Sequence, residues 1–161
     1  MAERPAVNAS PLIFLARSDL LDLLRLLSPE IVVPARVASE IERRGAADPT
    51  ARALASTPWL KTVEVGDIPP QIDRWDLGPG ESSVLAWCIE HPGTEAIVDD
   101  LAGRRCAQAL AIPVRGTLGL VLIGKQRGRI AAARPVLESM RRAGVYLSQR
   151  VLDRALRQVD E

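Results

Sequence analysis

The sequence has little of the residue types on which many enzymes depend: one histidine and two cysteines among 161 residues. The histidine, His91, precedes Pro92-Gly93 at a predicted helix end, where an imidazole interacts with the helix dipole. A single histidine in that place argues against a Ser-His-Asp triad and against a zinc-protease site. Cys88 and Cys106 lack metal-ligand spacing and lie in apolar helical patterns. They predict buried free thiols in a reducing cytoplasm.

Aromatic residues, charge of one sign and long apolar runs are also scarce. Aromatics make up 3% of the chain, so few side chains can stack on the bases of single-stranded nucleic acid. The net charge is +1, so no overall basic bias indicates a nucleic-acid partner. The apolar run at 12–16 is soon broken by Arg17 and is too short to span a membrane, and signal-peptide anatomy is lacking. We therefore expect a cytoplasmic protein without a membrane partner.

Short apolar strands alternate with helical patterns along the chain. Strands are expected at 6–9, 31–33, 62–65, 96–98 and 112–114, the third and the last at sheet edges. Helices are expected from Ser10-Pro11, over the leucine-rich stretch 20–27, from Pro34 to a stop at Gly45, and at 48–56, 81–90, 101–110, 117–126, 131–142 and 149–158. This alternation predicts an α/β fold, a three-layer α/β/α sandwich with a mainly parallel central sheet and extra C-terminal helices. We expect one domain over 1–161, with a core at about 6–128 and a helical extension at about 129–161.

Two adjacent carboxylates, Asp99 and Asp100, directly follow the apolar run 96–98. The carboxyl ends of strands in an open α/β sheet are where ligands bind. Two like charges side by side are unfavourable there unless a positive group lies between them. The simpler alternative is that Asp100 caps the helix that follows.

Two glutamates also lie at positions that favour the core or its margin. Glu81 shares a helical stripe with Val84, Leu85 and Cys88, although at the first turn of a helix it also interacts favourably with the helix dipole. Glu40 lies beside Ile41 at the edge of an apolar face, where a plain surface glutamate is the alternative.

In a parallel sheet, the asparagine, the two aspartates and the two glutamates are expected to converge at the edge formed by the carboxyl ends of the strands. The first strand ends near Asn8, the central strand ends at Asp99-Asp100, and two helices bring Glu40 and Glu81. Several carboxylates at one sheet edge repel one another without a cation, and Mg²⁺ or Mn²⁺ prefers such oxygen ligands. A bound ion of this kind activates water and neutralises charge on a phosphate.

Four segments carry a resemblance to a known family: VNASPL, VASEIERRG around Glu40, LGPGESSVLAW around Glu81, and AIVDDLAGRRCAQALAIPVRGTLGLVLIGKQRG. They are similar to the VapC-like PIN-domain nucleases, and most similar to a subgroup described as predicted nucleic-acid-binding proteins. The resemblance runs from about Val7 through the terminal helices. It implies an α/β/α sandwich and a metal-dependent ribonuclease, which is often the toxin of a toxin–antitoxin pair and is commonly a dimer.

The resemblance also implies which residues hold the metal. Glu40, Glu81 and the Asp99-Asp100 pair match the family's acidic residues, with Asp100 the better match to the late aspartate and Asp99 assisting it. One position departs from the pattern, because the family usually has aspartate where this chain has Asn8. An asparagine carbonyl can coordinate a metal but brings no charge and accepts no proton. We expect Asn8 to weaken metal binding and to reduce or abolish activity.

Substrate contacts are expected from Ser10, Thr117, Arg104 and Arg105. For Ser10 and Thr117 the alternative is a helix cap, and for the two arginines it is an ordinary solvated surface. The stretch from Leu101 to Leu137 has no acidic residue and contains seven basic ones: Arg104, Arg105, Arg115, Lys125, Arg127, Arg129 and Arg134. Lys125, Arg127 and Arg129 would extend an RNA path by backbone contacts.

Three functional hypotheses follow from the sequence. The first is a metal-dependent endoribonuclease with RNA as substrate, an antitoxin protein as partner, and a homodimeric state. The second is a PIN-like module that binds RNA or protein without catalysis, because of Asn8. The third is a protein that binds a partner through its leucine-rich stretch 20–27 and its terminal helices, although such leucines are commonly core.

Overall fold

The computed structural model describes residues 4–161, which contain a parallel sheet of five strands. The strands are β1 (Ala6–Val7), β2 (Ile31–Pro34), β3 (Leu60–Val63), β4 (Ala96–Ile97) and β5 (Val114–Arg115). Their order is β3-β2-β1-β4-β5, and every neighbouring pair is parallel. In the central strand, Ala6 is paired with Val32 on one side and with Ala96 on the other. The predicted parallel sheet is confirmed, and β3 and β5 form its edges as expected.

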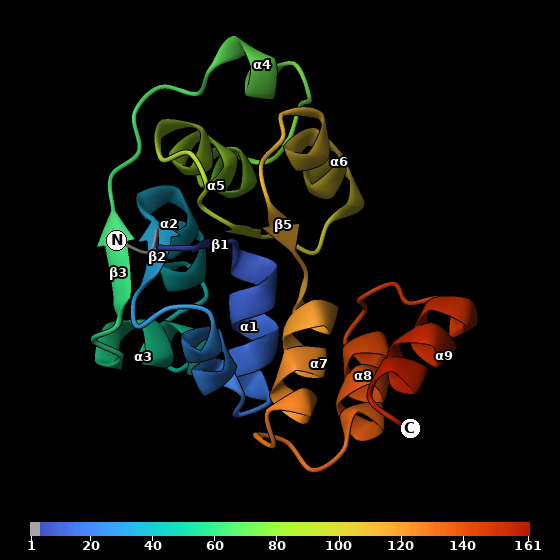
Figure 1. Ribbon diagram of the computed structural model, residues 1–161. Coiled ribbons are helices and arrows are strands. Elements are labelled where there is room, and N and C mark those ends of the chain that lie inside the picture. Colours follow the sequence, from blue (N-terminus) through green and yellow to red (C-terminus); the bar gives the residue numbers. More distant parts are fainter. Residues whose placement is uncertain (1–3) are drawn as a thin grey trace.

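Helices cover both faces of this sheet (Figure 1). They are α1 (Ala9–Arg17), the 3₁₀ helix η1 (Leu21–Leu26), α2 (Ala35–Glu42), α3 (Pro49–Ser56), α4 (Pro70–Asp73), α5 (Pro79–Glu90), α6 (Leu101–Ala109), α7 (Thr117–Gln126), α8 (Ala133–Arg142) and α9 (Gln149–Gln158). In Figure 1, α5 and α6 lie on one side of the sheet, whereas α1 and α7 lie on the other. The predicted three-layer α/β/α architecture is therefore confirmed.

The strands are short, apolar and buried, as expected for a parallel sheet covered on both faces. Both residues of β1 and the residues of β2 are buried, with Ala6, Val7 and Val32 fully inaccessible to solvent. Burial is incomplete along the edge strand β3, where Thr62 is exposed. The buried strands join Leu15, Leu85 and Leu120 from both helical layers in one core.

The order of the strands reverses next to β1. The chain proceeds from β1 to β2 and β3 in one direction, and then returns to place β4 and β5 on the other side of β1. The gap between the carboxyl ends of β1 and β4 is therefore a topological switch point, the place where open α/β sheets bind ligands. Asn8 follows β1 at this point, and Val98 leads from β4 to Asp99 and Asp100.

The leucine-rich stretch forms a 3₁₀ helix that is separate from α1. α1 ends at Arg17, and Asp19 adopts a φ of 56°, which turns the chain away. The leucines at 20, 23 and 26 and those at 21, 24 and 27 repeat every three residues. Three residues per turn is the period of a 3₁₀ helix, so this repeat places Leu23 and Leu24 in the core. The prediction that these leucines belong to the core is confirmed.

Two predicted helix caps are wrong. Ser10 is the second residue of α1 and is exposed, because the backbone N–H of Asn8 already bonds to the carbonyl of Ile97 at 3.0 Å and the chain leaves the sheet there. Thr117 is the first residue of α7, and Gly116 takes the N-cap position. The predicted cap of α9 is confirmed, because the Ser148 hydroxyl accepts a hydrogen bond from the N–H of Val151 at 3.2 Å.

The C-terminal helices α8 and α9 pack beside α7 (Figure 1). The side chain of Glu161 returns to the start of α8, where it accepts hydrogen bonds from the N–H groups of Ala133 at 2.6 Å and Arg134 at 3.1 Å. It also forms an ion pair with Lys125 of α7 at 3.6 Å. These contacts fasten the end of the chain to two helices.

Two further observations bear on the sequence predictions. Cys88 and Cys106 are free and buried, as predicted, and burial raises the pKa of the Cys88 thiol to about 12. Over residues 4–161, no helix has the length and apolar character needed to cross a membrane.

Candidate active site

Asn8 lies directly after the central strand, and its side chain does not cap the helix that follows. It occupies the N-cap position of α1, but its side chain makes no capping hydrogen bond. The residue is only 8% exposed, so the amide lies within the protein at the mouth of the switch point. An N-cap asparagine normally accepts a hydrogen bond from the helix N-terminus. This one instead faces α2 and α5.

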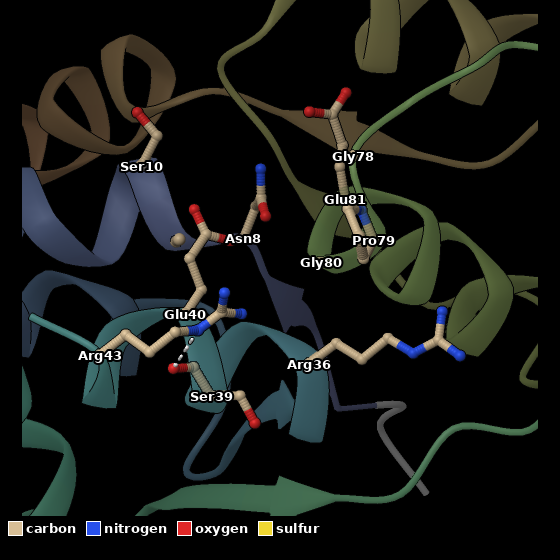
Figure 2. A pocket seen from close by; sticks show the side chains of 11 residues that line it. Asn8, Ser10, Arg36, Ser39, Glu40, Arg43, Gly78, Pro79, Gly80 and Glu81 are labelled. Carbon is tan, nitrogen blue, oxygen red and sulfur yellow. Dashed lines mark hydrogen bonds between the residues drawn. The ribbon is translucent and has the colours of Figure 1, made fainter.

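Gly80 marks where Asn8 and Glu40 meet. A Cβ atom on Gly80 would lie 3.1 Å from Oε2 of Glu40, 3.2 Å from Cγ2 of Val37 and 3.6 Å from Oδ1 of Asn8. The absence of a side chain therefore allows the first turn of α5 to approach α2 and the end of β1. Figure 2 shows the side chains of Asn8 and Glu40 close together beside this turn.

Glu81 lies in the first turn of α5 and is packed against α6. Its Oε1 atom is buried and has no hydrogen-bond partner among the described residues. A Cβ atom on Gly103 would collide with this carboxylate, so the glycine of α6 makes room for it. Burial, as the largest effect, together with the neighbouring carboxylates of Asp100 and Glu40, raises the pKa of Glu81 from 4.5 to about 7. These effects show that Glu40, Glu81 and Asp100 share one electrostatic environment.

Asp100 caps α6, as its position in the sequence suggested. Both capping hydrogen bonds end on the same oxygen, Oδ2, which accepts from the N–H of Ala102 at 3.1 Å and of Gly103 at 3.3 Å. Oδ1 takes no part in the cap. The cap therefore does not exclude the predicted role of Asp100 as a ligand, because it engages only one of the two carboxylate oxygens.

Asp99 is held by Thr117. Its Oδ1 accepts a hydrogen bond from the backbone N–H of Thr117 at 2.7 Å, and its Oδ2 accepts one from the Thr117 hydroxyl at 2.7 Å. Thr117 is fully buried, so the predicted contact between its hydroxyl and a substrate is not supported by this geometry. The pair ties the end of β4 to the start of α7 and fixes the backbone from which Asp100 projects.

Arg104 and Arg105 lie on α6 and differ in their surroundings. Nη1 of Arg104 donates a hydrogen bond to the carbonyl of Val98 at 3.2 Å, and a Cβ atom on Gly116 would lie 2.7 Å from it. Arg104 is thus bound to the end of β4, next to Asp99. Arg105 is exposed and does not line the pocket described next.

A pocket of about 650 Å³ opens over this site (Figure 2). Its walls come from α1, α2 and the first turn of α5: Asn8, Ala9, Ser10, Arg36, Ser39, Glu40, Arg43, Gly78, Pro79, Gly80 and Glu81. The predicted residues Asn8, Ser10, Glu40 and Glu81 therefore share one cavity. Arg36 and Arg43, which were not predicted as site residues from the sequence, lie four residues before and three residues after Glu40. That helical spacing is the signal that identifies them.

The residues at the switch point fit a hard divalent cation in their chemistry. Asn8, Glu40, Glu81 and Asp100 offer only oxygen donors, and the buried, unpartnered Oε1 of Glu81 is an acceptor that a cation would satisfy. Within residues 4–161, no three His, Cys, Asp or Glu side chains are already arranged as a metal-binding group. The candidate ligands therefore lie at one edge of the sheet, but their side chains are not close enough together to form a metal site in this structure.

The comparisons agree with this arrangement. No curated protein matches the chain at significant similarity. A family model described as a PIN domain, DUF3368, matches residues 5–161, which is nearly the whole chain. PIN domains have a nuclease-type fold and typically use divalent metal ions. The chain, with its acidic residues at the switch point of a parallel sheet, belongs to the PIN-domain family.

Proposed function

We propose that the protein is a metal-dependent endoribonuclease of the VapC-like type. The observation that carries this proposal is the buried and unpartnered Oε1 of Glu81, which lies in an environment shared with Glu40 and Asp100. An orphaned carboxylate oxygen among other carboxylates is unfavourable in the protein alone and favourable beside a cation. The oxygen-only donor set favours Mg²⁺ or Mn²⁺.

Glu40, Glu81, Oδ1 of Asp100 and Oδ1 of Asn8 would hold the ion. When bound, such an ion activates a water molecule and neutralises the charge that develops on a phosphodiester during its hydrolysis. Asp99 serves as a positioning residue, because both its oxygens are engaged by Thr117. Ser10 lies in the pocket wall and contacts the RNA there.

Asn8 makes the site less acidic than the family pattern. A neutral amide oxygen attracts a divalent cation less strongly than a carboxylate does, and it accepts no proton. This favours a second candidate function, in which the domain binds RNA or a protein partner without cleaving RNA. Asn8→Asp distinguishes the two, because it should create metal-dependent cleavage in a protein that has lost only this charge.

The biological setting of the proposed enzyme is that of a toxin in the cytoplasm, neutralised by an antitoxin protein and working as a homodimer. The motifs shared with VapC-like nucleases support this role. The two buried free thiols are compatible with a reducing compartment. Tyr146 is 90% exposed and Leu101 is 59% exposed, so apolar side chains are available for a protein contact.

The test is cleavage of a mixed single-stranded RNA pool by purified protein in Mn²⁺, in Mg²⁺ and in excess chelator. Glu81→Gln, which has the same shape and no charge, is the matched control for contaminating nucleases. Cleavage that requires metal and disappears in the variant supports the proposal. Equal cleavage by both proteins would show that the activity does not come from this site.

A further inference from the structure

We propose that Arg36 of α2 and Arg43 at the C-cap of α2 bind RNA phosphates on the two sides of the phosphate to be cleaved. This inference rests on the proposed function, because it assigns the path of the substrate across the same site. Both arginines line the pocket that contains Asn8, Glu40 and Glu81. Neither belongs to the basic stretch 101–137 that the sequence singled out.

The helix geometry places the two arginines on either side of Glu40. Arg36 is four residues before Glu40 and Arg43 is three residues after it, so all three side chains leave α2 on one face. Seven residues separate the arginines, which corresponds to about 10 Å along the helix axis. Figure 2 shows the guanidinium group of Arg43 beside Glu40, whereas the side chain of Arg36 extends away from Glu40. Because the two guanidinium groups lie apart, each arginine is assigned a different phosphate.

Neither guanidinium is neutralised by a carboxylate. Over residues 4–161, Arg36 and Arg43 form no ion pair, whereas Arg17 and Arg44 pair with Asp48 and Arg115 pairs with Glu95. Arg43 donates only from Nε, to the carbonyl of Ser39 at 3.4 Å, so both its terminal nitrogens are available. Both arginines are exposed and therefore accessible to a ligand. Planar guanidinium groups of this kind are well suited to phosphate oxygens.

The charge of the pocket explains why such arginines are needed. Its lining contains two glutamates and two arginines, and Asp100 adds a third carboxylate to the proposed ligand set. With the three carboxylates ionised around a divalent cation, the two arginines make the site positive by one charge, which favours a phosphodiester chain. Without Arg36 and Arg43, the cation would only balance the glutamates, and Asp100 would leave the site negative toward RNA.

The test measures RNA binding separately from cleavage. A fluorescent single-stranded RNA is titrated with Glu81→Gln protein that also carries Arg36→Gln or Arg43→Gln, at several salt concentrations. Arg52→Gln is the matched control, because Arg52 is an exposed arginine of α3 outside the pocket. We expect each pocket variant to weaken binding about 5- to 10-fold and to lower the slope of log affinity against log salt by about 0.7. Arg36→Lys, which keeps the charge, should retain the slope.

The outcomes separate this inference from the proposed function. If RNA binding depends on Arg36 and Arg43 but the wild-type protein never cleaves RNA, the inference stands and the nuclease proposal fails. If the wild-type protein cleaves RNA and both pocket variants keep the affinity and salt slope of Arg52→Gln, the inference is overturned. Failure of the wild-type protein to bind RNA at low salt overturns it as well. Thermal unfolding confirms that each variant is folded.

Discussion

Both carboxylate oxygens of Asp99 accept hydrogen bonds from Thr117, one from its backbone N–H and one from its hydroxyl, each at 2.7 Å. The two residues are 18 positions apart and join the end of β4 to the start of α7. Because Asp100 directly follows Asp99, this pair sets where Asp100 projects. Asp99 is thereby anchored to α7 directly before the residue that caps α6.

Thr117→Val removes the hydroxyl and keeps the shape of the side chain. We expect a loss of about 1 to 2 kcal/mol in the free energy of unfolding, because one charge-assisted hydrogen bond disappears in a buried place. Mn²⁺ binding should weaken as well, because Asp99 keeps only the hydrogen bond from the backbone N–H of residue 117 and holds the backbone of Asp100 less firmly. Urea unfolding and calorimetry measure the two effects. Thr117→Ser, which keeps the hydroxyl, should retain metal binding, and an equal loss in both variants would contradict the positioning role.

Gly103→Ala places a methyl group against the carboxylate of Glu81. In an exposed helix this change commonly stabilises, but here the new Cβ would collide with Oε1 of Glu81 and displace that side chain. We expect folded protein with at least 10-fold weaker Mn²⁺ binding. Gly119→Ala in α7 is the control, because its Cβ would contact only the flexible side chain of Arg115, at 3.3 Å from Cγ. Unchanged Mn²⁺ binding by Gly103→Ala would show that Glu81 is not a ligand.

The pH dependence of stability follows from Glu81. Its pKa in the folded protein is about 7, above the ordinary 4.5, so the folded state disfavours the ionised form. In chelator, this group therefore lowers the free energy of unfolding progressively as the pH rises from about 4.5 to about 7. Glu81→Gln should be more stable than the wild type at pH 8 by about 1 kcal/mol, a value reduced because the half-buried side chain is screened by solvent.

At pH 4 the Glu81→Gln protein and the wild type should have nearly equal free energies of unfolding, because Glu81 is then mostly protonated in both states. Urea unfolding at the two pH values measures the difference. A stability gain that is the same at pH 4 and pH 8 would mean that the charge of Glu81 is not its cause.

Glu161 provides a prediction about the C-terminal helices. The pKa of Glu161 lies below its ordinary value, mainly because the carboxylate accepts a hydrogen bond from the N–H of Ala133. The N–H of Arg134 and the charge of Lys125 lower the pKa as well, whereas burial opposes them. Its stabilising contribution is present above about pH 4.5 and is lost as the pH falls through the lowered pKa. We expect Glu161→Ala to lower the free energy of unfolding at pH 7 by about 1 kcal/mol, as for a lost helix cap.

Glu138→Ala is the control for this change, because it removes a carboxylate of α8 that forms no ion pair within residues 4–161. If both alanine variants unfold at the same urea concentration, Glu161 does not fasten α8. Amide exchange at Ala133 and Arg134 should rise only in Glu161→Ala.

The position of several candidate site residues could be predicted from the sequence, because the sheet topology determines where the residues after each strand lie. Asn8, Asp99 and Asp100 follow apolar runs, and parallel strands bring such positions to one edge. The roles of Asp99 and Asp100 could not be separated, since the difference depends on Thr117, the first residue of α7, which lies 18 positions further along the chain. Local sequence does not encode that distant contact.

Other features had a signal that was ambiguous. Arg36 and Arg43 are exposed helical arginines, and such residues are ordinarily part of a solvated surface; only the position of Glu40 between them sets them apart. Ser10 followed by Pro11 has the composition of a helix start, yet the hydrogen bond between Asn8 and Ile97 places the N-cap two residues earlier, at Asn8. For the start of α1, a tertiary contact therefore decides between positions that the local sequence leaves equal.

The most direct measurement of the central claim is Mn²⁺ binding by calorimetry to the wild-type protein, Glu81→Gln and Asn8→Asp under identical conditions at pH 7.5. We expect a single site in the wild type, at least 10-fold weaker binding in Glu81→Gln, and tighter binding in Asn8→Asp because a carboxylate replaces the amide. Identical Mn²⁺ isotherms for the three proteins would contradict the claim that Asn8, Glu40, Glu81 and Asp100 form the cation site of this PIN domain.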